Sequence, residues 1–210
     1  MRQGGSPALM AGAVFILFTI VSNPVSAQAV AIATVGGDVH PAALHMEKLG
    51  GEVVAALSDA SLTGDQRIAH FREVLTRDLD IPLIARFVAG RHWRTASPED
   101  RRAYVDAFGA YLVKTFSARL GGTAVDRFEV VGARGIGKAD ILVHSRVAPD
   151  GAKALRADWR VREKNGSFRI LDLSVEGISL ALTLRKEFAS VLRREGGIGG
   201  LVPILKDRAT

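Results

Sequence analysis

The chain has 210 residues, of which 48% are hydrophobic, and a formal net charge of +6, which suits a globular protein with a sizeable core. It contains no cysteine, so disulfide bonds, thiol catalysis and cysteine-ligated zinc are excluded. Its 28 lysines and arginines are spread along the chain without a block of like charge. The basic excess could suit nucleic acid or an anionic membrane surface, but its spread along the chain favours an ordinary solvated surface.

The first 27 residues have the pattern of a secretory signal peptide. Arg2 supplies the positive start, an apolar run follows from Ala8 to Val21, and small residues precede the expected cleavage after Ala27. Cleavage after Ala29 is the alternative. Because the apolar run is shorter than the ~20 residues that span a bilayer, we expect a cleaved signal and one exported domain over residues 28–210.

Three helices are predicted first, after an irregular lead up to Val39. A helix over Pro41–Asp59 is weakened by Gly50-Gly51. Thr63 and Gln66 form a capping box that opens a second helix. Pro82 suits the first turn of a short helix that ends at Ala89.

A longer helix is predicted to begin at Ser97-Pro98-Glu99-Asp100, because serine, proline and carboxylates favour a helix start. Its apolar stripe comprises Tyr104, Val105, Phe108, Tyr111, Leu112, Thr115 and Phe116, and Gly121-Gly122 ends it.

Four strands then follow, with the turn dipeptide Asn165-Gly166 before the last: Arg127–Val131, Ala139–Val147, Leu155–Glu163 and Phe168–Val175. A closing helix begins at Ser179 and stops at Gly196-Gly197. The sequence therefore predicts an α+β protein with a four-stranded antiparallel sheet.

The motifs give little indication of catalysis or nucleotide binding. Residues 132–138 spell GARGIGK, but Ala139 replaces the magnesium-binding hydroxyl and a strand follows, so we predict a hairpin turn. The five histidines lack metal-ligand spacing, and no G-x-S-x-G occurs. Asp172 and Glu176 lie four residues apart on a predicted strand, where they share a face and are a candidate acid and base pair.

Two segments in order, RFVAGRHWRTASPEDRRAYVDAFGAYLVKTFSARL and DWRVREKNGSFRILDLSVEGISLALTLRKEFASVLRREGG, resemble the MlaC, or toluene-tolerance, family of periplasmic lipid-binding proteins. The resemblance covers roughly residues 65–206. It implies an NTF2-like, cone-shaped sheet with helices against it, and an apolar cavity for phospholipid acyl chains. It further implies a periplasmic carrier without cofactor or catalysis. Its partners would be an outer-membrane lipoprotein complex and an inner-membrane ABC transporter with its substrate-binding ring.

Three alternatives remain open at this point. A hopanoid-linked carrier of the HpnM type resembles the same family, and its ligand needs the same kind of cavity. An NTF2-like enzyme would act on a small apolar substrate and place an acid or histidine, such as Asp172 or His144, inside the cone. In an interaction module, the protein's own side chains would fill the cavity.

On the resemblance, the large apolar side chains of facing elements are the candidate lipid-binding residues: Phe87, Val88, Trp93, Tyr104, Phe108, Tyr111, Leu112, Phe116, Trp159 and Ile178. Arg91, Arg94 and Arg119 are the candidate contacts of a lipid phosphate, since guanidinium groups form charge-assisted hydrogen bonds with phosphate.

Overall fold

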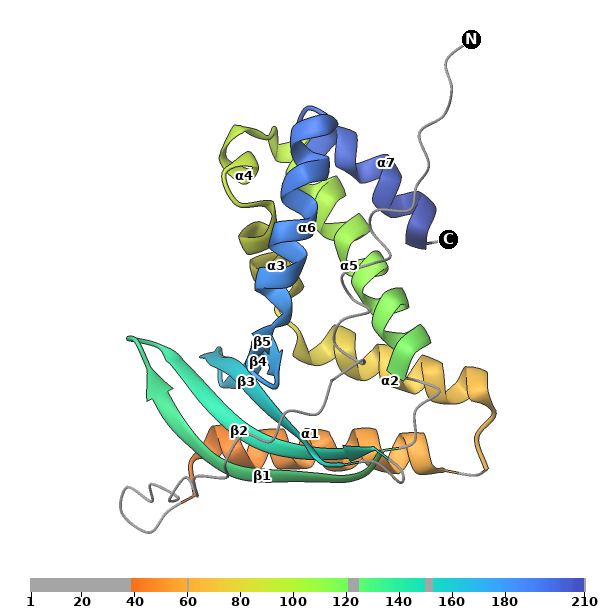
Figure 1. Cartoon of the computed structure of the whole chain (residues 1–210), viewed down its shortest axis with the longest axis vertical. Coiled ribbons are helices and arrows are strands. Elements are labelled where there is room, and N and C mark those ends of the chain that lie inside the picture. The colour runs from red at the N-terminus through yellow and green to blue at the C-terminus, as the bar shows by residue number, and fades with distance from the viewer. Residues whose placement is uncertain (1–38, 60, 121–124, 150–152, 210) are drawn as a thin grey trace.

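The computed structural model describes residues 39–59, 61–120, 125–149 and 153–209 (Figure 1). The expected signal peptide and its cleavage site lie outside these residues. Within them the chain forms seven helices and five strands. None of these helices combines the length and the hydropathy needed to cross a membrane.

The sheet is an antiparallel meander whose strands follow one another in chain order. The strands are β1 (Val125–Ile136), β2 (Asp140–Pro149), β3 (Leu155–Lys164), β4 (Ser167–Val175) and β5 (Ile178–Ser179). The α+β class is thus confirmed, but the prediction of four strands is wrong. Glu176 and Gly177 adopt positive φ angles of 49° and 82° and turn the chain back, so that Ile178 pairs with Val175. A two-residue strand is too short to produce an alternating pattern in sequence.

The first strand is longer than predicted. It continues past Val131 to Ile136, through a shift of register between Val130 and Gly132. The glycines in this stretch interrupt the alternation of apolar side chains that marks a strand in sequence. Glycine is nevertheless compatible with strand pairing where the register shifts. The turn predicted for GARGIGK is confirmed only at its end: residues 132–136 belong to β1, and the turn lies at residues 137–139, where Ile136 pairs with Asp140 across it. Asn165 and Gly166 form the other predicted turn, with φ angles of 53° and 75°.

Two helices cover one face of the sheet. They are α1 (Pro41–Ser58) and α2 (Gly64–Asp78), and the capping box predicted at Thr63 is present on α2. Helix α1 lies directly on β1 because Gly50 has no side chain, and a Cβ there would overlap the ring of Phe128. Apolar residues of α1, α2 and the sheet form what we call the sheet core: Ala42, Met46, Leu49, Val74, Val143, Val161 and Ile170.

The remaining helices form a bundle above the sheet (Figure 1). They are α3 (Ile81–Ala89), α4 (His92–Thr95), α5 (Pro98–Leu120), α6 (Leu180–Arg194) and α7 (Ile198–Ala209). We call their shared interior the bundle core; its fully buried members include Val88, Tyr104, Phe108, Leu184, Phe188, Leu192, Leu201 and Leu205.

Helix α7 was not predicted, because glycines and Pro203 give residues 198–209 a low helix propensity. The segment is helical because Ile198, Leu201 and Leu205 are buried in the bundle core, and tertiary packing outweighs propensity.

Candidate functional site

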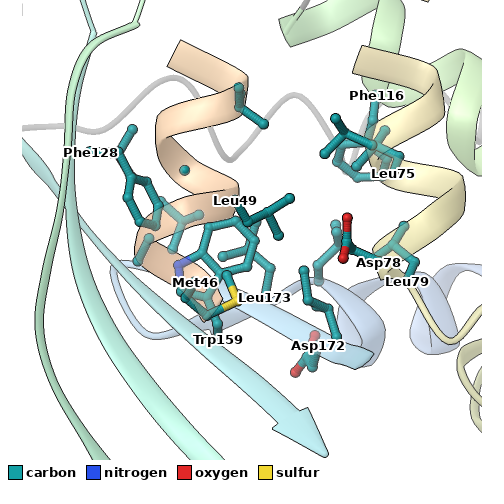
Figure 2. Close-up of a pocket in the computed structure, with 18 of the residues that line it drawn as sticks. Met46, Leu49, Leu75, Asp78, Leu79, Phe116, Phe128, Trp159, Asp172 and Leu173 are labelled. Carbon is teal, nitrogen blue, oxygen red and sulfur yellow. The ribbon is translucent and has the colours of Figure 1, made fainter. Parts of the chain in front are cut away.

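An apolar pocket of about 270 Å³ lies between the sheet core and the bundle core (Figure 2). Its wall takes Met46, Leu49 and Ile170 from the sheet core and Ile84, Leu112 and Leu184 from the bundle core. The other lining residues come from α1, α2, the sheet and the ends of α5 and α6: Gly50, Val53, Val54, Leu57, Phe71, Val74, Leu75, Asp78, Leu79, Phe116, Val125, Phe128, Val147, Leu155, Ala157, Trp159, Leu171, Asp172, Leu173, Val175, Ile178, Leu180 and Ala181.

Strand β3 contributes to this wall by alternation, whereas β4 lines it with consecutive residues from Ile170 to Leu173, where its pairing with β3 shifts register. Ala157 and Trp159 of β3 face the pocket, and so do Leu173 and Val175, their partners on β4. Between them along β3, Asp158 takes part in ion pairing on the opposite face. The alternation read from the sequence of this strand therefore places one row of side chains against the pocket.

The largest side chain of the sheet wall presents an apolar surface. The Trp159 ring packs against the Phe128 ring, with centroids 6.0 Å apart. Its indole Nε1–H donates to Ser145 Oγ at 2.9 Å, and that hydroxyl in turn donates to the carbonyl of Ala157 at 3.0 Å. Because the indole N–H is bonded within the sheet, the pocket meets only the hydrocarbon part of the ring.

Two carboxylates lie among the lining residues, and both are bonded to the protein. Asp78 Oδ2 accepts from Arg77 Nε at 2.8 Å, and its Oδ1 is 3.5 Å from His45 Nε2. Asp172 accepts from Ser179 Oγ at 2.5 Å and from the amide of Ala181 at 2.9 Å. Asp172 therefore serves the start of α6, where the helix dipole favours a negative charge.

The expectation that Asp172 and Glu176 share a strand face is wrong. Strand β4 ends at Val175, and Glu176 lies in the following turn, where its Oε1 accepts from the amide of Arg156 at 2.7 Å. The two carboxylates therefore have different partners: Asp172 bonds the start of α6, and Glu176 bonds the amide of Arg156 on β3. In the described part of the chain, moreover, no three histidine or acidic residues are grouped so that they could hold a metal ion.

The opposite face of the sheet carries two nearly buried aspartates, each held by two cationic or ionisable partners. Asp140 accepts from Arg160 Nε and Arg162 Nε, both at 2.6 Å. Burial alone would raise the pKa of Asp140, but the two arginines outweigh it and hold that pKa below its ordinary value.

Asp158 is held in the same way by Arg156 and by His144, whose Nδ1 is 2.7 Å from Oδ1. Burial raises its pKa, and the bonds from Arg156 and His144 lower it further than burial raises it. His144, a candidate for an enzyme site, thus lies on the outer face, and it is not among the pocket-lining residues.

Of the ten predicted lipid-binding residues, the structure places four in the pocket wall: Leu112, Phe116, Trp159 and Ile178. The other six do not line the pocket. Val88, Tyr104, Phe108 and Tyr111 are buried in the bundle core, Trp93 packs against it, and Phe87 is 39% exposed. Burial raises the pKa of the Tyr104 hydroxyl, which has no hydrogen-bond partner among the described residues.

Two of the three arginines predicted for a phosphate lie away from the pocket. Arg91 and Arg94 lie at α4, at the end of the bundle remote from the sheet (Figure 1). The side chain of Arg119 lies outside the described residues.

The sequence analysis missed the contribution of α1 and α2 to the wall. Met46, Leu49, Val53 and Leu57 follow one another at helical spacing along α1, and Phe71, Val74 and Leu75 do so on α2. That spacing marks a buried helix face, but it does not show what the face meets.

Comparison with known proteins adds two findings. A family model described as MlaC protein matches residues 47–207. A solved structure of a phospholipid-binding protein from Ralstonia solanacearum, in complex with a phospholipid, is similar with a TM-score of 0.67 and 23% sequence identity. The match covers 80% of this chain and 96% of that one, so the two proteins share a fold over most of their length.

Proposed function

The chain belongs to the MlaC family, and from this premise we propose that it is a periplasmic carrier which holds phospholipid acyl chains in the pocket between its two cores. It carries lipid between an outer-membrane lipoprotein complex and an inner-membrane ABC transporter, and it does so without covalent chemistry. The observation that carries the proposal is the apolar wall, whose two carboxylates are both bonded to the protein. The phospholipid bound by the Ralstonia solanacearum protein supports the same class of ligand.

The energetic task of such a carrier is to shield methylene groups from water. At about 0.8 kcal/mol for each CH₂, two chains of ~16 carbons represent roughly 25 kcal/mol of gross transfer free energy. A carrier that left one chain in water would lose about half of this. We therefore expect both chains to be enclosed.

The pocket has to widen for that purpose. Its volume of about 270 Å³ is below the range of about 300–1,000 Å³ typical of sites for drug-sized ligands, and a diacyl lipid is larger than such ligands. Because the pocket lies along the seam between the sheet core and the bundle core, we expect loading to move the two cores apart.

Two leucines on neighbouring strands provide a matched test. Leu155 lines the pocket, whereas Leu142, also half-buried, belongs neither to the pocket wall nor to either core. Leu155→Trp should fill part of the pocket and reduce co-purified lipid several-fold, while Leu142→Trp should leave the lipid content unchanged. Lipid is measured by mass spectrometry of extracts, and thermal melting confirms that both variants fold.

The identity of the extracted lipid decides between the related proposals. Glycerophospholipid is the expected result, whereas a pentacyclic triterpenoid would indicate the hopanoid-linked carrier. Absence of lipid from the wild-type protein, or equal lipid in both variants, would contradict the proposed use of the pocket.

A further inference from the structure

Helices α3 and α6 expose large apolar side chains on the outside of the molecule, next to the pocket. Phe87 of α3 is 39% exposed, Leu182 of α6 is 50% exposed and Ile178, just before α6, is 44% exposed. Ile178 also lines the pocket and so lies at its rim. Solvent-facing apolar side chains at the rim of a lipid pocket suggest contact with another apolar phase.

Arg185 of α6 connects that helix with Phe87 of α3 at the surface. The Arg185 guanidinium lies over the Phe87 ring, 4.9 Å from its centroid, and donates to the Phe87 carbonyl at 3.2 Å. Leu182 precedes Arg185 by three residues and therefore lies beside it on the helix surface. We define the α3–α6 face as Arg86, Phe87, Leu182, Arg185 and Lys186, all of which are exposed.

The charge of this region is almost entirely positive. Helices α3, α4 and α6 contain a single acidic residue, Glu187, and both of its carboxylate oxygens are buried. The acids that flank α3 and the start of α6 are bonded within the protein: Asp80 to Lys164, Asp172 to Ser179, and Glu176 to the Arg156 amide. The cations of the α3–α6 face are therefore available to an anionic surface.

We propose that the α3–α6 face docks on anionic phospholipid bilayers and brings the pocket rim at Ile178 to the lipid surface. The inference rests on the proposed function, since the ligand of a lipid carrier comes from a bilayer. Phe87 and Leu182 enter the boundary between headgroups and acyl chains, while Arg86, Arg185 and Lys186 meet the phosphates. Helix α6 then has two roles, because Ala181 and Leu184 on its inner side line the pocket.

The test is sedimentation of the purified chain with vesicles of phosphatidylcholine, with and without phosphatidylglycerol. Binding should require phosphatidylglycerol and weaken with salt. Arg185→Gln/Lys186→Gln should weaken it by roughly 25-fold, at about fivefold for each cation removed. The matched control Arg134→Gln/Lys138→Gln removes the same charge from exposed positions at the distant β1–β2 hairpin and should change binding little.

A third variant separates docking from lipid storage. Leu182→Ser, outside the pocket wall, should lose vesicle binding and keep its co-purified lipid. An equal loss in both double variants would reveal unspecific charge attraction and overturn the proposal. Failure of the wild type to bind vesicles would also overturn it. If Leu182→Ser nevertheless slowed lipid transport, the face would be assigned to an acidic protein partner. Absence of co-purified lipid from the wild-type protein would instead contradict the proposed function.

Discussion

The bundle core and the pocket region are built from the same kinds of residue, yet one is filled and the other is not. In the bundle, Phe108 is in contact with two further aromatic rings, at centroid distances of 5.7 Å to Tyr104 and 6.0 Å to Phe188. In the pocket region, the inward row of the sheet, α1 and α2 enclose free volume. An apolar stripe therefore predicts burial, and the spacing of the layers decides whether the buried space holds side chains or a ligand.

Truncation of one phenylalanine in each region of the same helix gives the largest expected effect. Phe108 is completely buried in the bundle core, and Phe108→Ala should cost about 3–5 kcal/mol of unfolding free energy. Phe116 lines the pocket and is half-buried, so Phe116→Ala should cost only about 1–2 kcal/mol, because it enlarges an existing space. Denaturant unfolding measures both values, and equal losses would contradict the division into filled and unfilled regions.

A pair of adjacent glycines tests how α1 sets the width of the pocket. Gly50→Ala places a methyl group against the Phe128 ring and should cost about 1–3 kcal/mol or push that ring into the pocket. Gly51→Ala meets no atom within 4 Å and should stabilise α1 by about 0.5–1 kcal/mol. Melting and lipid content are measured together. The idea of a glycine-dependent contact fails if Gly50→Ala keeps wild-type lipid and stability.

The sequence predicted the class of the fold and most of its helices and strands, because caps, turns and alternation are local signals. Thr63 with Gln66, Asn165 with Gly166, and the alternation along β3 all have the predicted consequences. The pocket was harder to place, since facing elements could not be paired from sequence. The stripe on α5 was assigned to the cavity, but Tyr104 and Phe108 meet the other helices of the bundle.

Two pairs of glycines account for two further differences between the prediction and the structure. Gly50 weakens a helix locally but permits close contact with Phe128, which only the tertiary structure reveals. Gly196 and Gly197 end α6 as predicted, yet the chain resumes as α7 because its apolar residues find a place in the bundle core.

The aspartates on the outer face should make the sheet wall sensitive to acid. The pKa of Asp140 is lowered in the folded protein, so its stabilising effect is present above the unfolded pKa near 4 and is lost as pH falls through the lower folded pKa. Asp140→Asn should therefore reduce stability by about 1–2 kcal/mol at pH 7, since both arginines are partly exposed. The difference from the wild type should shrink at about pH 3. Thermal melting at the two pH values checks this, and a constant difference would refute it.

The smallest expected effect comes from a side chain at the pocket wall that is shortened without creating a new cavity. Trp159→Phe removes the indole N–H bonded to Ser145 and leaves that hydroxyl its bond to the Ala157 carbonyl. The expected cost is about 0.5–1 kcal/mol, because the lost volume joins a pocket that already exists and one hydrogen bond disappears. Ser145→Ala is the control, since it leaves the indole N–H without its acceptor and should cost about 1–3 kcal/mol.

Lipid content should remain near that of the wild type in Trp159→Phe, because an aromatic face still lines the pocket. If Trp159→Phe instead lost as much stability as Phe108→Ala, Trp159 would belong to a filled core, and the contrast between the two regions would fail at the centre of the sheet.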